Sequence, residues 1–168
     1  ASAAALSCLG AQAQTFPDKP MKIIVGAPAG GSADVIARSL GEGVSQLLGQ
    51  PVIVDNKPGA AGLIGAGDLL KSPRDGATFM VQLNAIASEI PHAVKVPFDP
   101  LKALRPLAEL SRFGLVMAAN TQVPANTLPE FVNHAKANKG KINYASYSAG
   151  TLSHTLGVEL NKLAGLDM

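Results

Sequence analysis

Short apolar runs alternate with segments of helical periodicity over the first half of the chain. The runs at 21–27, 52–54 and 78–83 are apolar and partly β-branched, which predicts three buried strands. Between the first two runs, apolar positions recur at helical spacing over 35–48, and Gly49 is a typical residue for the end of that helix. The first half of the chain therefore predicts strands joined by amphipathic helices.

The residues beside these segments sharpen their boundaries. Ser32 is expected as the N-cap of the first helix, and Asp34 lies in its first turn, where the helix dipole favours an acidic side chain. A turn at 56–59 leads into an Ala/Gly-rich segment that predicts a short helix to about Lys71. The alternation of strands and helices predicts a parallel sheet with right-handed crossovers, and hence an α/β fold.

The second half of the chain is less regular. Four prolines between 91 and 106 mark a change of structural unit. Beyond them, a helix is predicted over 128–137 with Thr127 as its N-cap, and another over 150–164. Three apolar runs predict further strands, at 107–110, 115–119 and 142–146. We therefore expect a second β/α unit that begins near residue 107.

The first 13 residues are small and apolar and carry no charge. They end in Ala11-Gln12-Ala13, which fits the pattern that precedes signal-peptidase cleavage, here before Gln14. A disordered Ala-rich leader is the alternative. Thirteen residues are too few to span a bilayer, and no other segment is long and apolar enough to do so. We therefore expect an exported protein that is not embedded in the membrane.

These features divide the chain into three expected parts. They are the remnant of an export signal (1–13), a first α/β lobe (14–106) and the start of a second α/β lobe (107–168). A lone strand-helix-strand-helix unit buries its sheet poorly, so we expect this second unit to be truncated, with the C-terminal part of the fold missing.

Composition excludes several classes of protein. Of the 168 residues, 47% are hydrophobic and 15% are charged, which excludes a disordered chain. The net charge is +2 without a basic cluster, and only 4% of the residues are aromatic, so the composition gives no indication of a nucleic-acid-binding surface. The single Cys allows neither an internal disulfide nor a Cys-based zinc site, and the three His lack the spacing of metal ligands.

The loop between the first strand and the first helix is the first candidate for chemistry. Its candidate residues are Pro28, Ala29, Gly30, Gly31, Ser32 and Asp34. Free N–H groups at a helix N-terminus form an anion site, and glycines let a ligand approach the backbone closely. A plain strand-to-helix turn remains the alternative. Asp34 would repel an anion unless N–H groups or a cationic ligand group occupy its charge.

A second loop of the same design precedes the last predicted helix. Its candidate residues are Ser146, Ser148, Ala149, Gly150 and Thr151, with Ser153 and His154 after them. The hydroxyl groups can donate hydrogen bonds to a carboxylate. N-capping is the alternative role for the hydroxyls, and packing or solvent exposure is the alternative for His154. Two such loops would face each other if the lobes close on a ligand.

Enzyme motifs are weak. The chain has no Gly-x-Ser-x-Gly nucleophile elbow, no zinc-binding pair of His and no Gly-Lys-Ser/Thr phosphate loop. A dinucleotide site is the main enzyme alternative, with Gly26, Gly30 and Gly31 after the first strand and Asp55 at the end of the second. However, the glycine spacing differs from G-x-G-x-x-G, and Pro28 removes an N–H group from the turn. We therefore expect a binding protein without catalysis or cofactor.

Several motifs occur in an order and spacing that resemble the Bug-type periplasmic solute-binding proteins, the receptors of tripartite tricarboxylate transporters. The matching segments run through most of the chain after Ala13. They are 16–20 (FPDKP), 28–34 (PAGGSAD), 48–52 (LGQPV), 56–62 (NKPGAAG) with 64–65, Pro73 with 75–76 and Thr78, 97–100 (PFDP), and 140–144 (GKINY) with Ser146, Gly150, Ser153 and His154.

The resemblance implies an α/β fold of the periplasmic binding protein type II, in which two lobes enclose a ligand cleft and this chain forms the N-terminal half. It implies a monomeric periplasmic receptor that captures a di- or tricarboxylate, an amino acid or an aromatic acid and delivers it to membrane transporter subunits. The two loops would hold the ligand carboxylate, and Asn84 and Ser88 after the third strand would line the same cleft. An exported sensor that passes the same ligand to a signalling partner is the alternative.

Overall fold

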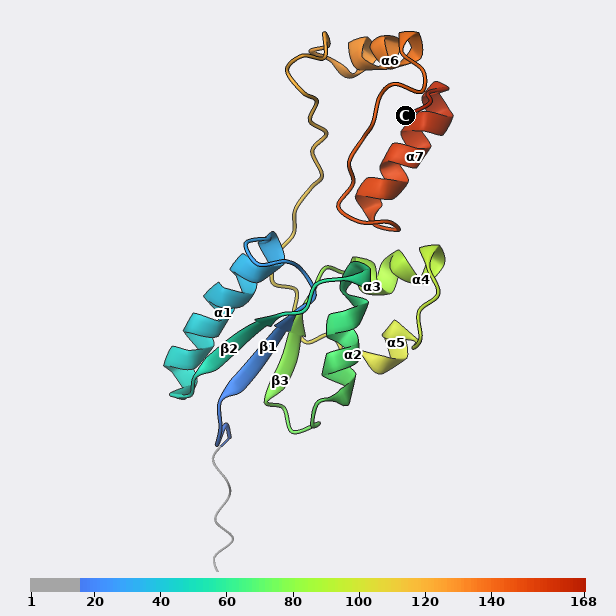
Figure 1. Ribbon diagram of the computed structural model, residues 1–168. Coiled ribbons are helices and arrows are strands. Elements are labelled where there is room, and N and C mark those ends of the chain that lie inside the picture. Colours follow the sequence, from blue (N-terminus) through green and yellow to red (C-terminus); the bar gives the residue numbers. More distant parts are fainter. Residues whose placement is uncertain (1–15) are drawn as a thin grey trace, which may run out of the picture.

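The computed structural model describes residues 16–168 (Figure 1). The predicted export-signal remnant, with its cleavage site before Gln14, lies outside the described residues. The first half of the chain folds in the predicted order of strands and helices. Its elements are β1 (Met21–Val25), α1 (Ser32–Leu48), β2 (Val52–Asn56), the 3₁₀ turn η1 (Ala60–Gly62), α2 (Leu63–Lys71) and β3 (Thr78–Val81).

The three strands form a parallel sheet, as predicted, and their order is β2-β1-β3. Met21 of β1 is in register with Val52 of β2, and Lys22 of β1 with Thr78 of β3. Because all three strands run in one direction, their carboxyl ends meet at one edge of the sheet. The loops that follow the strands therefore emerge at that edge.

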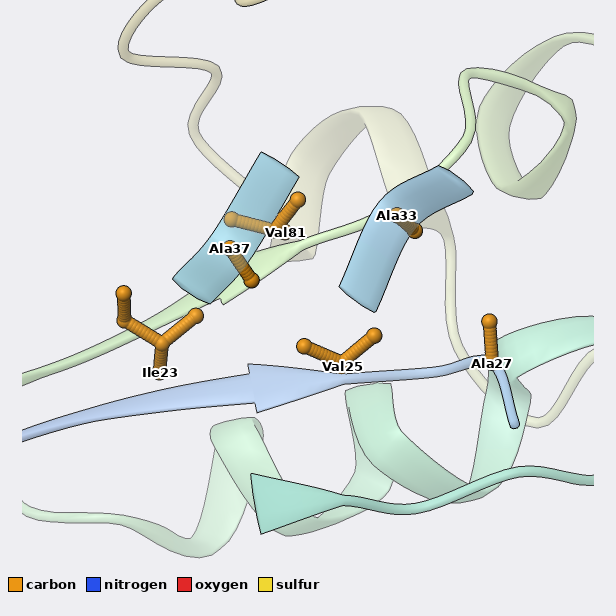
Figure 2. Packing of buried hydrophobic residues seen from close by; sticks show 6 residues of the cluster. All are labelled: Ile23, Val25, Ala27, Ala33, Ala37 and Val81. Atoms are coloured by element: carbon orange, nitrogen blue, oxygen red, sulfur yellow. The ribbon is translucent and has the colours of Figure 1, made fainter. Parts of the chain in front are cut away.

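The main core lies between α1 and one face of the sheet. Its buried side chains are those of Ile23, Val25, Ala27, Ala33, Ala37 and Val81 (Figure 2). Ile24 alternates with these strand residues and points to the opposite face, where a Cβ added to Gly65 of α2 would lie 3.3 Å from its side chain. The helices α1 and α2 therefore cover opposite faces of the sheet.

The boundaries of α1 are close to the predicted ones. The N-cap is Gly31, with φ −73° and ψ 165°, so the prediction of Ser32 as the N-cap is wrong by one residue. No side chain caps this end, because glycine has no side-chain oxygen to accept from the first amides. Gly49 ends the helix in the left-handed conformation, with φ 66°, as predicted.

A left-handed turn connects β2 to α2. Gly59, Ala60, Ala61 and Gly62 have φ values of 120°, 47°, 54° and 93°. The left-handed conformation costs a non-glycine residue about 1–2 kcal/mol. The side chain of Gln82 lies against this turn, since a Cβ added to Gly62 would be only 2.2 Å from its Nε2 atom. Glycine is therefore required at position 62 for both conformation and space.

The two helices predicted for the second half are present. In α6 (Leu128–Ala137), Thr127 is the N-cap and forms a capping box with Glu130, which confirms the predicted start. In α7 (Leu152–Ala164), the helix starts two residues later than predicted, because Gly150 has φ +79°. None of the helices within residues 16–168 has the length and hydrophobicity needed to cross a bilayer.

The strands predicted at 107–110, 115–119 and 142–146 are wrong. The segment 105–120 is exposed throughout and runs as an extended connection toward α6 (Figure 1). A strand forms only where a second strand completes its ladder of hydrogen bonds. No described residue pairs with any of these three segments as a strand. An apolar run without a pairing partner therefore does not form a strand.

Three one-turn helices were not predicted from the sequence. They are α3 (Ala85–Ser88), α4 (Ile90–Ala93) and α5 (Pro100–Ala103). Four residues are too few to show helical periodicity. Ile90 is fully buried and fixes α4 to the body of the fold, while the side chain of Asp99 caps α5.

Gly150 brings the two halves of the chain into contact. A Cβ added to Gly150 would lie 2.6 Å from the Cβ of Ala93 and 3.4 Å from the Cδ1 of Ile90. The backbone before α7 thus packs directly on α4, at a distance that only a glycine permits. In Figure 1 the N-terminal end of α7 faces α3 and α4.

Candidate anion-binding site

The start of α1 carries three free backbone amides. The N–H group of Val35 donates to the carbonyl oxygen of Gly31 at 3.0 Å, which is the first hydrogen bond of the helix. The N–H groups of Ser32, Ala33 and Asp34 have no acceptor within residues 16–168. Such amides, together with the helix dipole, attract an anion.

The loop leading to these amides is open to solvent. Pro28, Ala29, Gly30 and Ser32 are exposed, and Gly31 is half-buried. The N–H group of Gly31 donates to the carbonyl oxygen of Pro28 at 3.3 Å, and Gly30 has φ +82°. The loop therefore turns sharply, and most of the residues that lead into the helix are open to solvent.

Among residues 16–168, Asp34 is the only buried carboxylate, with 3% of its surface exposed. Its Oδ2 atom accepts from the Gly30 N–H at 2.9 Å and from Arg38 Nε at 3.0 Å. Its Oδ1 atom accepts from Asn56 Nδ2 at 2.9 Å and lies 3.0 Å from Arg38 Nη2. An anion can bind at this helix start only if donors occupy the charge of Asp34. The structure shows these donors.

These donors stabilise the ionised form of Asp34. The Arg38 hydrogen bond has the largest effect, followed by those from Gly30 and Asn56, and together they lower the pKa of the Asp34 carboxyl to about 2. The group is therefore ionised at neutral pH. Its charge stays bound to protein donors.

The contacts of Arg38 and Asn56 with Asp34 were not predicted from the sequence. The spacing of Asp34 and Arg38, four residues apart on a helix, was a signal that could have revealed the first. Asn56 is 22 residues from Asp34, and only the pairing of β1 with β2 brings it to the site. The local sequence pattern therefore does not indicate the role of Asn56.

The start of α7 repeats this arrangement of amides. The N–H group of Thr155 donates to the carbonyl oxygen of Thr151 at 3.0 Å. The amides of Leu152, Ser153 and His154, which precede it, have no acceptor in the described part of the chain. Both helix starts thus present three free N–H groups.

Side chains hold the second loop in shape. Thr151 is buried and donates its hydroxyl hydrogen to the carbonyl oxygen of Ser148 at 2.6 Å. The Oγ atom of Ser153 accepts from the N–H of Tyr147 at 3.1 Å, and Nδ1 of His154 accepts from the N–H of Gly150 at 3.0 Å. Thr151, Ser153 and His154 therefore fix the loop from within.

The other predicted residues occupy the surface near these loops. Ser146 and Ser148 are half-buried, and Ala149 is exposed. Asn84 and Ser88 are exposed on α3, beyond the carboxyl end of β3, and the Asn84 amide donates to Ser88 Oγ at 3.2 Å. In Figure 1 the N-terminal ends of α1 and α7 both lie beyond the carboxyl ends of the strands. Whether these residues bind one ligand together stays a prediction.

The residues considered for other chemistry have structural partners. Asp55, the acid of the dinucleotide alternative, forms ion pairs with Lys22 at 2.6 Å and Lys57 at 3.6 Å. Both lysines lower the pKa of the Asp55 carboxyl, chiefly through the hydrogen bond from Lys22. Residues 16–168 contain no group of three or more His, Cys, Asp or Glu side chains placed to hold a metal ion.

Residues 36–168 match the family described as "Tripartite tricarboxylate transporter family receptor". The chain is 38% identical to the "UPF0065 protein in gbd 5'region" of Cupriavidus necator, over 98% of this chain and 52% of that protein. It is 34% identical to protein BugT of Bordetella pertussis, over 86% of this chain and 45% of that protein.

Solved structures show the same similarity. The periplasmic binding protein BugD matches with a TM-score of 0.74 and 30% identity, over 91% of this chain and 51% of that one. MatC from Rhodopseudomonas palustris, a structure with bound malate, matches with a TM-score of 0.75 and 25% identity, over 90% of this chain and 52% of that one. The chain thus spans about half the length of the relatives it matches.

Proposed function

The chain belongs to the tripartite tricarboxylate transporter family of receptors, which includes the Bug-type solute-binding proteins, and from this premise we propose that it is a periplasmic receptor for a small organic carboxylate. The matched family is described as a receptor family, and the matched structure of BugD as a periplasmic binding protein. One of the matched structures contains malate, a dicarboxylate. A di- or tricarboxylate is accordingly the first ligand class to test.

The observation that carries this proposal is the pair of helix starts with unpaired amides. Ser32 to Asp34 in α1 and Leu152 to His154 in α7 supply N–H donors and the positive ends of two helix dipoles. Aligned backbone donors bind a carboxylate without an arginine in the pocket. The charge of Asp34 does not oppose this, because Arg38 is paired with it.

We propose that the ligand lies between a first lobe, residues 14–106, and a second lobe that begins near residue 107. The ligand-binding residues of the first lobe would be Pro28, Ala29, Gly30, Gly31, Ser32 and Asp34 with Asn84 and Ser88, and those of the second Ser146, Ser148, Ala149, Gly150 and Thr151. Closure of the lobes would be a hinge motion that the ligand selects. The exposed segment 105–120 connects the two parts and gives such a hinge room to bend.

In the cell, the receptor would act in the periplasm as a monomer and deliver its ligand to membrane transporter subunits. No catalytic step and no cofactor are part of this function. Binding requires only that donors, dipoles and lobe closure favour the anion over water.

Calorimetric titration and thermal melting of the full chain test the proposal. The panel is L-malate, citrate and acetate, each with its amide and with sodium chloride at matched ionic strength. At a ligand concentration a hundred times Kd, binding would stabilise the fold by about 2.7 kcal/mol and raise the Tm accordingly. One acid should act while its amide does not. Equal shifts with acid and amide, or no heat and no shift with any acid, would contradict the proposed function.

A further inference from the structure

Three groups converge on the carboxylate of Asp34. Arg38, one turn further along α1, meets both oxygens, with Nε 3.0 Å from Oδ2 and Nη2 3.0 Å from Oδ1. Asn56, at the end of β2, donates Nδ2 to Oδ1 at 2.9 Å. Gly30, in the loop itself, donates its N–H to Oδ2 at 2.9 Å.

The charge of this carboxylate matters for any anion at the start of α1. Asp34 belongs to the same helical turn as the free amides, and its charge has the same sign as a bound carboxylate. With 3% of the residue exposed, water screens that charge poorly. The guanidinium of Arg38 meets the carboxylate with two nitrogens, which is the geometry of a strong charge-assisted pair.

Asn56 links the two ends of the loop. Its Nδ2 atom also donates to the carbonyl oxygen of Ala27 at 3.2 Å, and its Oδ1 atom accepts from Arg38 Nη2 at 3.1 Å. Ala27 is buried at the point where the loop begins, and Asp34 holds the backbone of Gly30 further along. One side chain from β2 therefore braces the loop from its beginning to the first turn of α1.

We propose that Arg38 and Asn56 are positioning residues of the anion site, which fix the loop through Asp34 and cancel its charge so that the amides of α1 can receive a carboxylate. This inference rests on the proposed function and deepens it, because it assigns a role to two side chains that act through Asp34 and not by donating to the ligand. The charge of Asp34 weakens binding only when Arg38 is absent.

Titration of the full chain with L-malate tests the charge effect through Arg38→Gln, Asp34→Asn and the double variant. Arg38→Gln should raise Kd at least about tenfold, because the buried charge of Asp34 is then uncompensated beside the bound anion. The double variant should recover part of the affinity lost in Arg38→Gln, because no charge is left to compensate although the bracing contact of Arg38 stays absent. A double variant as weak as Arg38→Gln, or an unchanged Kd in Arg38→Gln, would overturn the proposal. Arg112→Gln, which removes the exposed pair with Glu109, is the matched control and should bind normally.

Amide hydrogen exchange tests the bracing without any ligand. Arg38→Gln and Asn56→Ala should speed exchange of the Gly30 amide at least about tenfold, while the amides of Ile23 and Ile24 in β1 keep their wild-type rates. Unchanged Gly30 exchange in both variants would overturn the positioning role. If Gly30 responds as expected while the wild type binds no L-malate, the positioning role is supported and the malate assignment of the proposed function fails.

Discussion

Gly31 is the position where the anion site can be perturbed with the least damage to the fold. It is the N-cap of α1, and its φ of −73° and ψ of 165° are accessible to any residue. An added Cβ would meet only the carbonyl oxygen of Pro28, at 3.3 Å, so a shift of a few tenths of an ångström suffices. Asp and Asn are preferred N-cap residues, and replacing Gly by either changes stability by about a few tenths of a kcal/mol. Gly31→Asp should therefore fold and melt like the wild type.

The effect of Gly31→Asp on binding should be large. The new carboxylate would accept hydrogen bonds from the amides that the ligand needs, and each lost charge-assisted bond removes about 1.5–3 kcal/mol. Two like charges about 4 Å apart repel by about 1 kcal/mol in water and about 4 kcal/mol near a protein surface. The sum corresponds to binding that is weaker by at least about a hundredfold.

Two further variants separate shape from charge. Gly31→Asn has the shape and capping ability of the aspartate without its charge, and should weaken L-malate binding by about tenfold, the value of one lost hydrogen bond. Gly31→Ala adds only the Cβ and should stay within about threefold of the wild type. Calorimetric titration gives Kd, and thermal melts confirm folding. A well-folded Gly31→Asp with wild-type Kd would refute the assignment of the first loop, and equal losses in the Asp and Asn variants would refute the electrostatic reasoning.

Three other perturbations test the physical basis of the fold. The pKa of Asp34 is lowered to about 2, so its contribution to stability is complete above the unfolded-state pKa of about 4 and is lost as the pH falls toward 2. The Tm advantage of the wild type over Asp34→Asn should therefore shrink between pH 5 and about pH 2. A Tm difference that stays constant over this range would contradict the prediction. Thr127→Ala removes the capping box and should destabilise α6 by about 1 kcal/mol, seen as roughly fivefold faster amide exchange in that helix. Gly62→Ala would place a Cβ 2.2 Å from Gln82 Nε2 at a φ of +93°, so the Tm should fall, and adding Gln82→Ala should restore only part of it because the backbone strain of about 1–2 kcal/mol remains.

The local sequence pattern predicts two kinds of element. One kind is stabilised by interactions within a few residues, and the other is almost completely buried. The run 21–27 is apolar because β1 is buried on both faces between α1 and α2, and the capping box at Thr127 needs only residues within one turn. The runs at 107–110 and 115–119 have the same apolar character, yet form no strand. Their state depends on a pairing partner, which local pattern cannot supply.

The candidate site divides in the same way. A glycine-rich loop before a helix is visible in the sequence, and so are the hydroxyl-bearing residues before α7. The pairing of Asn56 with Asp34 is not visible, because it depends on β2 lying beside β1. The internal use of the Thr151 hydroxyl depends on the exact fold of the second loop, where Ser148 accepts its hydrogen. Sequence thus identifies the loops, and tertiary structure determines which groups are free to bind.

The most direct test of the central claim is an amide NMR titration of the full chain with L-malate. If the free amides at the two helix starts bind one carboxylate, the N–H signals of Ser32, Ala33 and Ser153 should move downfield together along a single binding curve. The signals of α6 should stay in place, and malamide should have no effect. Shifts confined to one helix start, or absent from both at millimolar malate and citrate, would contradict the account.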